Sequence, residues 1–563
     1  MGSADSHISP GFVAWGAAAV FGVSLVFFSL FFDYGLAVLD EGVLIQGIRL
    51  QAEGRMDFAK FCHYSSLYRW FSLLFSDGRP NLEVVRAVWV VIRSATAVLI
   101  FLISARVVSK RWAWVPVVLF LSLPGPWHKA FVAFSLCLCL HAMVRLVGSA
   151  SVLRYVWLAL CVAFAFAVHP YTAVPTLLGW VGVAAVVPAL RRGPFSASSP
   201  LRRFLLWHGS FGLALVVFTV LLADYVRQVN PFTLGAHNLS LIVSIASGSR
   251  ILAAQLGRCA VDPQIALILS MYLMVLPIMA IALWIVLKDG WSADSDVTWA
   301  AVLCLVIVGL PNLSKWVIRL DLSHFLQNAA PIWILLVFVL SRLVVWKGGW
   351  GGLARCAIGA LFCSWIAVIV IFGLTSSDIF VGSIGTRLFT DTVDLPHPHG
   401  VLHVKPKVRD SLQSLERAIR DNSSADDPVL ICASPKILYY LAERQSPLIV
   451  PMIVFPSSSF ATSFKEMAAE IRRKKTAVIL FQDSPIIPRE RFRLVNLAPE
   501  LYSLITTEYQ LVDEIDGIQI RTIRSVGAVD EGEFGNPGRR LATSVRRKSP
   551  FSLEHDADID GLP

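Results

Sequence analysis

Long uncharged apolar runs recur along the first two thirds of the chain, and they constrain its fold more than any other feature. The first run, residues 11–32, has 22 residues without a charge. A helix needs about 20 residues to cross a bilayer. Comparable runs follow at 84–105, 112–126, 130–148, 153–168, 172–190, 204–223, 264–287, 298–311, 329–346 and 356–374. The sequence therefore predicts a polytopic α-helical membrane protein with about 11 transmembrane helices.

The overall composition agrees with this class and excludes others. Hydrophobic residues make up 56% of the 563 residues and charged residues only 16%, whereas soluble proteins have about 25% charged residues. The net charge of +10 is expected from basic cytoplasmic loops, and no basic stretch is interleaved with aromatic residues, so we predict no nucleic-acid partner. The nine cysteines form no CxxC pair and show no zinc-ligand spacing.

Basic residues are concentrated in alternate loops between the runs, which predicts the orientation in the membrane. One set of loops contains Arg106, Lys110, Arg111, Arg145, Arg154, Arg191, Arg192, Arg202, Arg203, Lys288, Arg342, Lys347 and Arg355. The positive-inside rule places these loops in the cytoplasm. The loop after the first span, the loops at 224–262 and 312–328, and everything after residue 375 are then outside. We predict a multi-pass protein of the plasma membrane, the inner membrane of a cell that has two.

The first outer loop, residues 33–82, is rich in acids near the membrane. It contains Asp33, Asp40, Glu41, Glu53 and Asp57. Carboxylates beside a span are costly to desolvate and often mark a site, although solvated loop acids are the alternative. The stretches 43–54 and 64–75 have apolar residues at helical spacing, which predicts short amphipathic helices in the membrane interface. Buried helices of a soluble loop domain are the alternative.

The character of the chain changes after the last span. Residues 376–525 are predicted to form an extracytoplasmic α/β domain, with strands at 429–433 and 477–481 and helices at 435–444 and 463–475. Residues 508–523 predict two strands around an Asp516-Gly517 turn. The tail, 526–563, lacks periodicity and is predicted to be disordered. The expected domains are thus 1–375, 376–525 and the tail.

Four stretches resemble a known enzyme family. They are LDEGVLIQGIRLQAEGRMDFAKFCHY (39–64), LPGPW (123–127), IRLDLSHF (318–325) and ILYYLAERQSP (437–447). With the predicted topology, they resemble the GT-C glycosyltransferases, which take a sugar from a polyprenyl-phosphate carrier at the outer face of the membrane. Bacterial protein mannosyltransferases and lipid A aminoarabinose transferases are examples. The resemblance covers most of the chain in layout but only about 60 residues in motif.

The resemblance implies an active site at the outer face, formed by the first outer loop and the loop at 312–328. The acceptor hydroxyl must lose a proton during transfer, and Asp40 best matches the family's general base. The leaving phosphate gains negative charge, so cations must face it. The implied residues are Asp40, Glu41 and Asp57 for catalysis, Lys315, Arg319 and His324 for the donor phosphate, and Asp321, His63 and Tyr64 for the sugar or acceptor.

Two other groups of residues leave alternatives open. Arg86 and Arg93 lie seven residues apart on the second span; they either meet the carrier or make structural pairs, and we favour pairing. His397, His399 and His403 have a spacing that a metal could use, but Pro and Gly flank them and no acid lies within the motif. Asp33, Asp40, Glu41 and Asp57 offer oxygen ligands that suit a divalent cation. Metal dependence is left open, and no metal ligand is assigned.

The sequence thus predicts an enzyme that moves a sugar from a polyprenyl-phosphate donor to an extracytoplasmic glycan, lipid or protein acceptor, in contact with membrane lipids. A transporter or flippase of lipid-linked substrates is the first alternative. It is disfavoured because the sequence has no pair of broken helices in repeated halves. A non-catalytic scaffold of the same fold is the second alternative, and it predicts that Asp40 can be replaced without effect.

Overall fold

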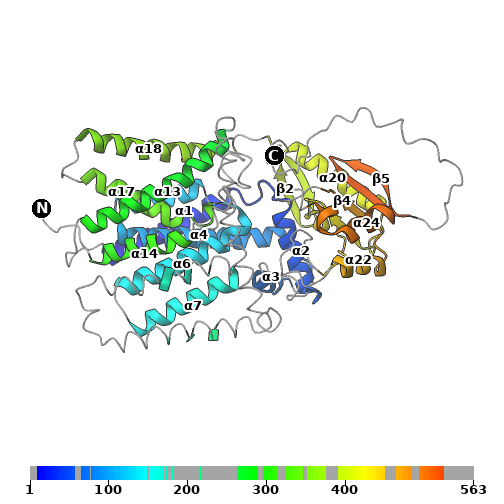
Figure 1. Cartoon of the computed structure of the whole chain (residues 1–563), viewed down its shortest axis with the longest axis horizontal. Helices are drawn as coiled ribbons and strands as arrows, with labels where there is room; N and C mark the ends of the chain where they lie inside the picture. Colours follow the sequence, from blue (N-terminus) through cyan, green and yellow to red (C-terminus); the bar gives the residue numbers. More distant parts are fainter. Residues whose placement is uncertain are drawn as a thin grey trace. The chain divides into compact units, whose positions relative to one another are not determined.

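The computed structural model divides the chain into two compact units (Figure 1). The helical unit comprises residues 1–34 and 84–390, and the mixed unit comprises 35–83 and 391–563. The structure describes residues 9–56, 65–75, 78–123, 125–148, 151–169, 263–288, 296–312, 325–345, 352–375, 391–449, 464–483 and 493–524, together with residue 388 and scattered residues between 173 and 220.

Helices occupy nine of the predicted apolar runs in the described part of the helical unit. Their bounds are α1 Pro10–Ser29, α4 Leu82–Val107, α5 Val115–Ser122, α6 Ala130–Gly148, α7 Val152–Val168, α13 Pro263–Lys288, α14 Asp296–Asn312, α17 Ala330–Val345 and α18 Gly352–Thr375; the 3-10 turn η1 is Trp127–Lys129. The runs at 172–190 and 204–223 lie mostly outside the described residues.

Length and composition allow four of the described helices to cross a membrane: Pro10–Ser29, Leu82–Val107, Trp127–Val147 and Leu269–Lys288. The other apolar helices are shorter. Local signals explain some of the boundaries. Ser9 caps α1 by accepting a hydrogen bond from the backbone N–H of Phe12 at 3.3 Å, and Pro10 occupies the first turn. These helices fit a helical membrane protein, while the total of eleven spans stays a prediction.

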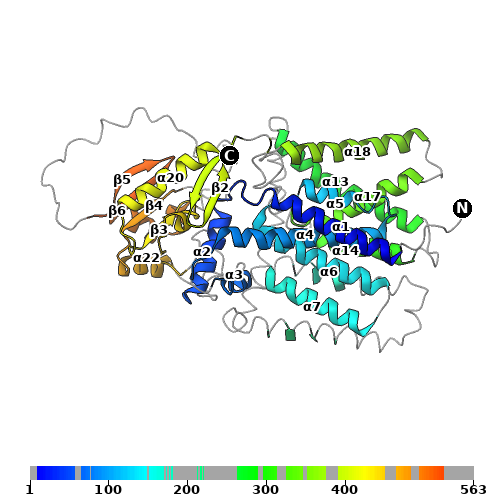
Figure 2. The same ribbon diagram turned by 180° about the vertical axis from the view of Figure 1, so that it is seen from behind.

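Helix α17 packs against α5, α13, α14 and α18. Helices α13, α14 and α17, coloured green, pack against one another, and α6 packs against α7 (Figures 1 and 2). Every residue from Ala330 to Leu340 of α17 is buried. A helix that is apolar on all sides and buried on all sides belongs to the core of a bundle.

Contacts between loops agree with the predicted alternation of the spans. Arg154, at the start of α7, donates a hydrogen bond to the carbonyl of Arg145, at the end of α6, over 2.8 Å. The ammonium of Lys110 lies 5.7 Å from the ring of Phe12, near the start of α1. Both contacts join segments that the basic residues assign to the same side. Which side is cytoplasmic stays a prediction.

The mixed unit contains two sheets. Strands β1 (Val393–His397) and β2 (Gly400–Val404) form an antiparallel hairpin. The larger sheet has the order β3-β4-β6-β5, from β3 (Val429–Cys432), β4 (Val478–Phe481), β5 (Tyr509–Ile515) and β6 (Ile518–Ile523). β3 and β4 are parallel and the other pairs antiparallel. Asp516 and Gly517 both have positive φ (50° and 76°), as a tight hairpin turn requires, so the predicted Asp-Gly turn is confirmed.

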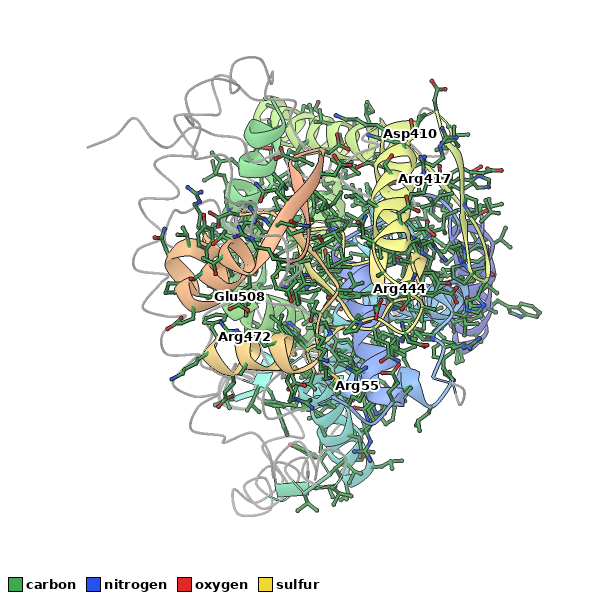
Figure 3. The ribbon with its side chains drawn as sticks, turned by 90° about the vertical axis from the view of Figure 1, so that its right-hand side faces the viewer. Arg55, Asp410, Arg417, Arg444, Arg472 and Glu508 are labelled. Carbon is green, nitrogen blue, oxygen red and sulfur yellow. The ribbon has the colours of Figure 1, made fainter. Side chains whose placement is uncertain are left out.

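Helices of the C-terminal segment accompany these sheets: α20 Pro406–Asp421, α21 Leu438–Leu441, α22 Phe464–Arg473, α23 Leu494–Leu497 and α24 Pro499–Thr507. Arg472 of α22 pairs with Glu508, the residue after α24, at 2.5 Å (Figure 3). The strands predicted at 429–433 and 477–481 are confirmed. The predicted helix over 435–444 is a single turn, and the hairpin and α20 were not predicted.

The first outer loop contributes two helices to the mixed unit, α2 (Asp40–Ala52) and α3 (Ser65–Ser72). Helix α2 packs against α3 and α21, and its residues 41–48 and Leu50 are buried. The interfacial prediction for this helix is therefore wrong, because nearly every side of it is covered. The alternative, a buried helix of a loop domain, describes α2. Helix α3 is amphipathic as predicted, since it buries Leu67 and Phe71 and exposes Arg69.

Candidate functional site

The Asp-Glu-Gly triplet forms the first turn of α2. Asp40 is the first residue of this helix and its side chain is exposed. Glu41 is fully buried, and its Oε2 accepts a hydrogen bond from the backbone N–H of Ala37 at 2.8 Å. Both carboxylates lie where the helix dipole favours negative charge. Glu41 is thus buried and hydrogen-bonded, whereas Asp40 faces outward, and the catalytic roles predicted for both stay predictions.

Gly42 allows the start of α2 to approach the segment before α21. A Cβ atom at this position would overlap the backbone N of Ile437 and the carbonyl carbon of Lys436. The backbone N–H of Ile437 also donates to the carbonyl of Val38 at 3.0 Å. Only glycine fits so close a backbone approach. The triplet is therefore held on both sides of Asp40 by backbone contacts.

Two arginines strengthen the same junction farther along the loop. Nη1 of Arg49 donates to the carbonyl of Arg444 at 3.0 Å, and Nη2 of Arg55 donates to the carbonyl of Ser446 at 2.8 Å. Glu53 pairs with both arginines, at 2.9 and 2.8 Å. Arg55 and Arg444 are labelled in Figure 3. The first and fourth stretches of the family resemblance are thus packed against each other within one unit.

The segment that receives α2 is itself fixed by buried polar groups. Arg444 donates from Nε to the hydroxyl of Ser423, from Nη2 to the Ser423 carbonyl and from Nη1 to the Ala442 carbonyl. Lys436 is fully buried and donates to the carbonyl of Ile431, and its burial lowers its pKa to about 8. These bonds keep residues 436–444 in a single conformation against which α2 packs.

The β1–β2 hairpin contacts both ends of the first outer loop. At the start of the loop, Gly35 N–H donates to the carbonyl of His403 at 2.7 Å. At its end, Oε1 of Glu83 lies 3.7 Å from Nε2 of His397. The ring of His397 also lies within hydrogen-bond distance of the Tyr440 hydroxyl, at 3.0 Å. The hairpin therefore fixes the loop that carries Asp40 at both of its ends.

The structure does not gather the three histidines of this hairpin into a metal site. Nδ1 of His403 faces Asp394 at 3.0 Å, whereas His397 faces Glu83 and Tyr440. Among the described residues, no group of three or more His, Cys, Asp or Glu side chains could hold a metal ion.

In the helical unit, Arg86 and Arg93 of α4 are both buried. Arg86 donates to the carbonyl of Phe32, beyond the end of α1, at 2.6 Å. Arg93 donates to the carbonyl of Gly125, and its guanidinium lies 3.8 Å from the centroid of the Trp127 ring. These contacts agree with the structural pairing that we favoured, and they attach α4 to the LPGPW turn.

The LPGPW turn in turn contacts the segment before α17. Gly125 has a φ of +76°, and a Cβ there would lie 3.3 Å from Cβ of Leu326. The LPGPW stretch thus meets the residues that directly follow the IRLDLSHF stretch. Seven predicted site residues lie outside the described residues, and their roles stay predictions: Asp57, His63, Tyr64, Lys315, Arg319, Asp321 and His324.

Two buried amides at this place escaped the sequence analysis. Gln327 and Asn328 are 3% and 1% exposed, and their side-chain nitrogen and oxygen atoms have no hydrogen-bond partner among the described residues. A pair of amides at the border of a long apolar run is the sequence signal that was available for them.

No protein-family model and no curated protein matches the sequence. The structure is similar to the oligosaccharyltransferase of Archaeoglobus fulgidus in its apo form, at 10% identity and a TM-score of 0.49 over 91% of this chain and 75% of that chain. It is also similar to ArnT of Cupriavidus metallidurans in the apo state, at 11% identity and a TM-score of 0.48 over 90% and 98%. A structure of that ArnT bound to undecaprenyl phosphate gives 13% identity and a TM-score of 0.44 over 90% and 97%.

These proteins are of the kind that the four sequence stretches resemble. Identities of 10–13% and TM-scores below 0.5 do not by themselves assign it an activity.

Proposed function

We propose that this protein is a membrane glycosyltransferase that moves a sugar from a polyprenyl-phosphate donor to an acceptor outside the cytoplasm. The observation that carries the proposal is the first turn of α2. Glu41 and Gly42 are used to fix this turn, and Asp40 presents an exposed carboxylate from it. A catalytic group must be held in place by the residues around it, and the contacts of Glu41 and Gly42 hold the exposed acid Asp40 in this way.

Asp40 acts as the general base in this proposal. The acceptor hydroxyl attacks the anomeric carbon of the sugar, the bond from that carbon to the phosphate oxygen breaks, and the hydroxyl proton passes to Asp40. The electron pair of the broken bond stays on the polyprenyl phosphate. Cations stabilise that developing charge, and we assign this role to Lys315, Arg319 and His324. Asp57 is a further catalytic acid, and Asp321, His63 and Tyr64 contact the sugar or acceptor.

The acceptor is a glycan, a lipid or a protein, and the site faces away from the cytoplasm of the plasma membrane. The loop acids Asp33 and Asp40 offer oxygen ligands that a divalent cation accepts, but no transfer step described above needs a metal. The mixed unit, which contains the base, is proposed to lie outside with the loop that it includes.

Replacing Asp40 by Asn tests the proposal. The amide keeps the shape of the side chain but takes up no proton, so we expect transfer to fall by about 10²–10⁴-fold. Transfer of labelled sugar from undecaprenyl-phosphate-mannose or undecaprenyl-phosphate-glucose to a cell-envelope extract is the measurement. Asp426→Asn, an exposed acid in a turn of the same unit, is the control. Unchanged transfer in a folded Asp40→Asn protein would favour the scaffold alternative, and lipid movement across liposomes without transfer would favour the flippase.

Arg319→Lys tests the phosphate assignment. A guanidinium binds two phosphate oxygens at once and an ammonium does not. We expect donor affinity to fall by about tenfold, equal to roughly 1.4 kcal/mol. Donor titration with the purified protein measures it. If Arg319 only anchors lipid head groups, the lysine variant will bind the donor as the wild type does.

A further inference from the structure

The segment before α17 buries two adjacent amide side chains. Gln327 and Asn328 are 3% and 1% exposed, and all four of their side-chain polar atoms lack a hydrogen-bond partner in the part of the chain that the structure describes. Buried polar groups in proteins are almost always hydrogen-bonded, because leaving one without a partner is costly. Two such groups side by side point to a ligand that supplies the missing bonds.

The surroundings of these amides offer further polar groups at the same end of the helical unit. Ala329 accepts from the N–H groups of Ile332 and Trp333 at 2.9 and 3.0 Å, so the amides directly precede the N-terminus of α17, which has 16 residues. The backbone of Gly125 lies against Leu326 and Gln327. Two residues on, the indole Nε1 of Trp127 is also buried and has no hydrogen-bond partner among the described residues.

The chemistry of an amide restricts what this ligand is. Each side-chain amide presents one oxygen that accepts and one nitrogen that donates. An ionised phosphate only accepts and would leave both amide oxygens without a partner. An ammonium or guanidinium only donates and would leave both nitrogens without one. A hydroxyl donates and accepts, so a group with several hydroxyls satisfies the oxygen and the nitrogen of both Gln327 and Asn328.

We propose that Gln327 and Asn328 bind the hydroxyl groups of the sugar on the lipid-linked donor. This inference rests on the proposed glycosyltransferase function and adds to it a sugar-recognition site that is separate from the base and from the phosphate-binding cations. It also explains why polar amides are retained at the start of an apolar helix, where leucine would pack at no polar cost.

The test replaces each amide by an apolar residue of similar size, in Gln327→Leu and Asn328→Leu. Ser341→Ala on α17 is the control, because its buried hydroxyl already donates to the carbonyl of Phe338 at 2.7 Å. Binding to the purified full chain in nanodiscs is measured for undecaprenyl-phosphate-mannose, undecaprenyl-phosphate-glucose and undecaprenyl phosphate. We expect each leucine variant to bind at least one sugar-carrying lipid about tenfold more weakly, with binding of undecaprenyl phosphate unchanged within twofold.

The melting temperature of the protein in nanodiscs, measured without any polyprenyl lipid, is a second readout. A structural role of the amides would change it in the direction opposite to a ligand-binding role. If the amides make their hydrogen bonds only with a bound ligand, replacing them by leucine leaves the melting temperature of the ligand-free protein unchanged or raises it. If they have partners inside the protein, each leucine variant melts lower than Ser341→Ala, and the inference is overturned. Equal affinity of wild type and variants for both sugar-carrying lipids, as a bound water would give, also overturns it.

Lipid binding by the wild type shows separately whether the proposed function itself is wrong. A wild-type protein that binds none of the three lipids overturns the glycosyltransferase proposal and, with it, this inference. The two failures are distinguished by undecaprenyl phosphate, which binds the amide variants normally if only the sugar site is wrong.

Discussion

The two units bury positive charge in different ways. In the mixed unit, Arg444 donates from its three nitrogens to a hydroxyl and two carbonyls in loops next to it. In the helical unit, Arg86 and Arg93 reach carbonyls at Phe32 and Gly125, past the end of α1 and between α5 and η1. Each unit thus pairs its buried arginines with backbone carbonyls, but at different kinds of place.

The difference follows from the supply of carbonyl groups. A helix uses its backbone carbonyls internally except in the last turn, so a bundle of long helices offers acceptors only where helices end. An α/β unit has loops throughout and offers them at many points. In a bundle, a buried arginine therefore marks a break in a neighbouring helix, and both breaks marked here adjoin segments that carry proposed functional residues.

The largest expected effect comes from a glycine that lies against another backbone segment. Gly42 in the mixed unit is such a glycine, whereas Gly22 in α1 is not. Gly42→Ala places a methyl group against the backbone of Lys436 and Ile437, which cannot move as a side chain does. We expect a loss of about 3 kcal/mol or more in the free energy of unfolding of the mixed unit. Hydrogen exchange of peptides from residues 429–448, measured in increasing urea, reports it.

Gly22→Ala is the matched control, since a Cβ at position 22 in α1 meets nothing within 4 Å. We expect it to change stability by less than about 1 kcal/mol, in the stabilising direction. If both glycine variants exchange alike, the close approach of α2 to residues 436–437 is wrong.

The next effect compares the buried arginines directly. Arg444→Met removes donors from two loop carbonyls and a hydroxyl, and we expect it to cost about 2–3 kcal/mol in the mixed unit. Arg93→Met also removes a charge from an apolar environment, which offsets the lost bond, so we expect a change of about 1 kcal/mol or less. Hydrogen exchange of peptides covering 429–448 and 84–130 measures both, and similar losses in the two variants would remove the distinction.

The smallest effect is a pH dependence. Burial lowers the pKa of Lys436 from 10.5 to about 8, so between pH 8 and 9 the unfolded chain binds more protons than the folded one. Stability therefore rises with pH, by about 1 kcal/mol over this interval. From about pH 8 upward this gain is partly opposed, and increasingly so above pH 9, because burial raises the pKa of Cys432 from 9.0 to about 11.

Urea unfolding of the wild type and of Lys436→Met at pH 8.0, 8.5 and 9.0 tests this dependence. The methionine variant lacks the titrating amine and should not show the rise, and the Cys432 thiol should make its stability fall slightly over these values. A rise of equal size in both proteins would mean that another group titrates.

Local patterns predicted much of the fold, and long-range contacts account for what they missed. The strands at 429–432 and 478–481 and the Asp516-Gly517 turn follow from residues that are close in sequence. The burial of α2 does not, because its partners lie about 400 positions away, as in the Arg49–Arg444 bond across 395 residues. An amphipathic pattern indicates that one face of a helix is buried, but it does not indicate whether lipid or protein buries that face.

The candidate site shows the same division. Asp40 was proposed because an Asp-Glu-Gly triplet beside a span is unusual, whereas the different surroundings of its neighbours required the contacts of Glu41 with Ala37 and of Gly42 with Ile437. Gln327 and Asn328 were missed because an amide beside an apolar run has no distinctive pattern until its burial and missing partners are known.

The mixed unit is assembled from two segments that the ribosome makes at very different times. Helix α2 leaves the ribosome near the beginning of synthesis, and its partner segment 395 residues later. At about 5–20 residues per second, α2 waits roughly 20–80 s with its apolar residues uncovered. All the apolar runs between them must be synthesised first. Covering of α2 thus reports that all the apolar runs have been made, and a chain terminated before residue 436 would expose α2 to the proteases and chaperones that remove incomplete proteins.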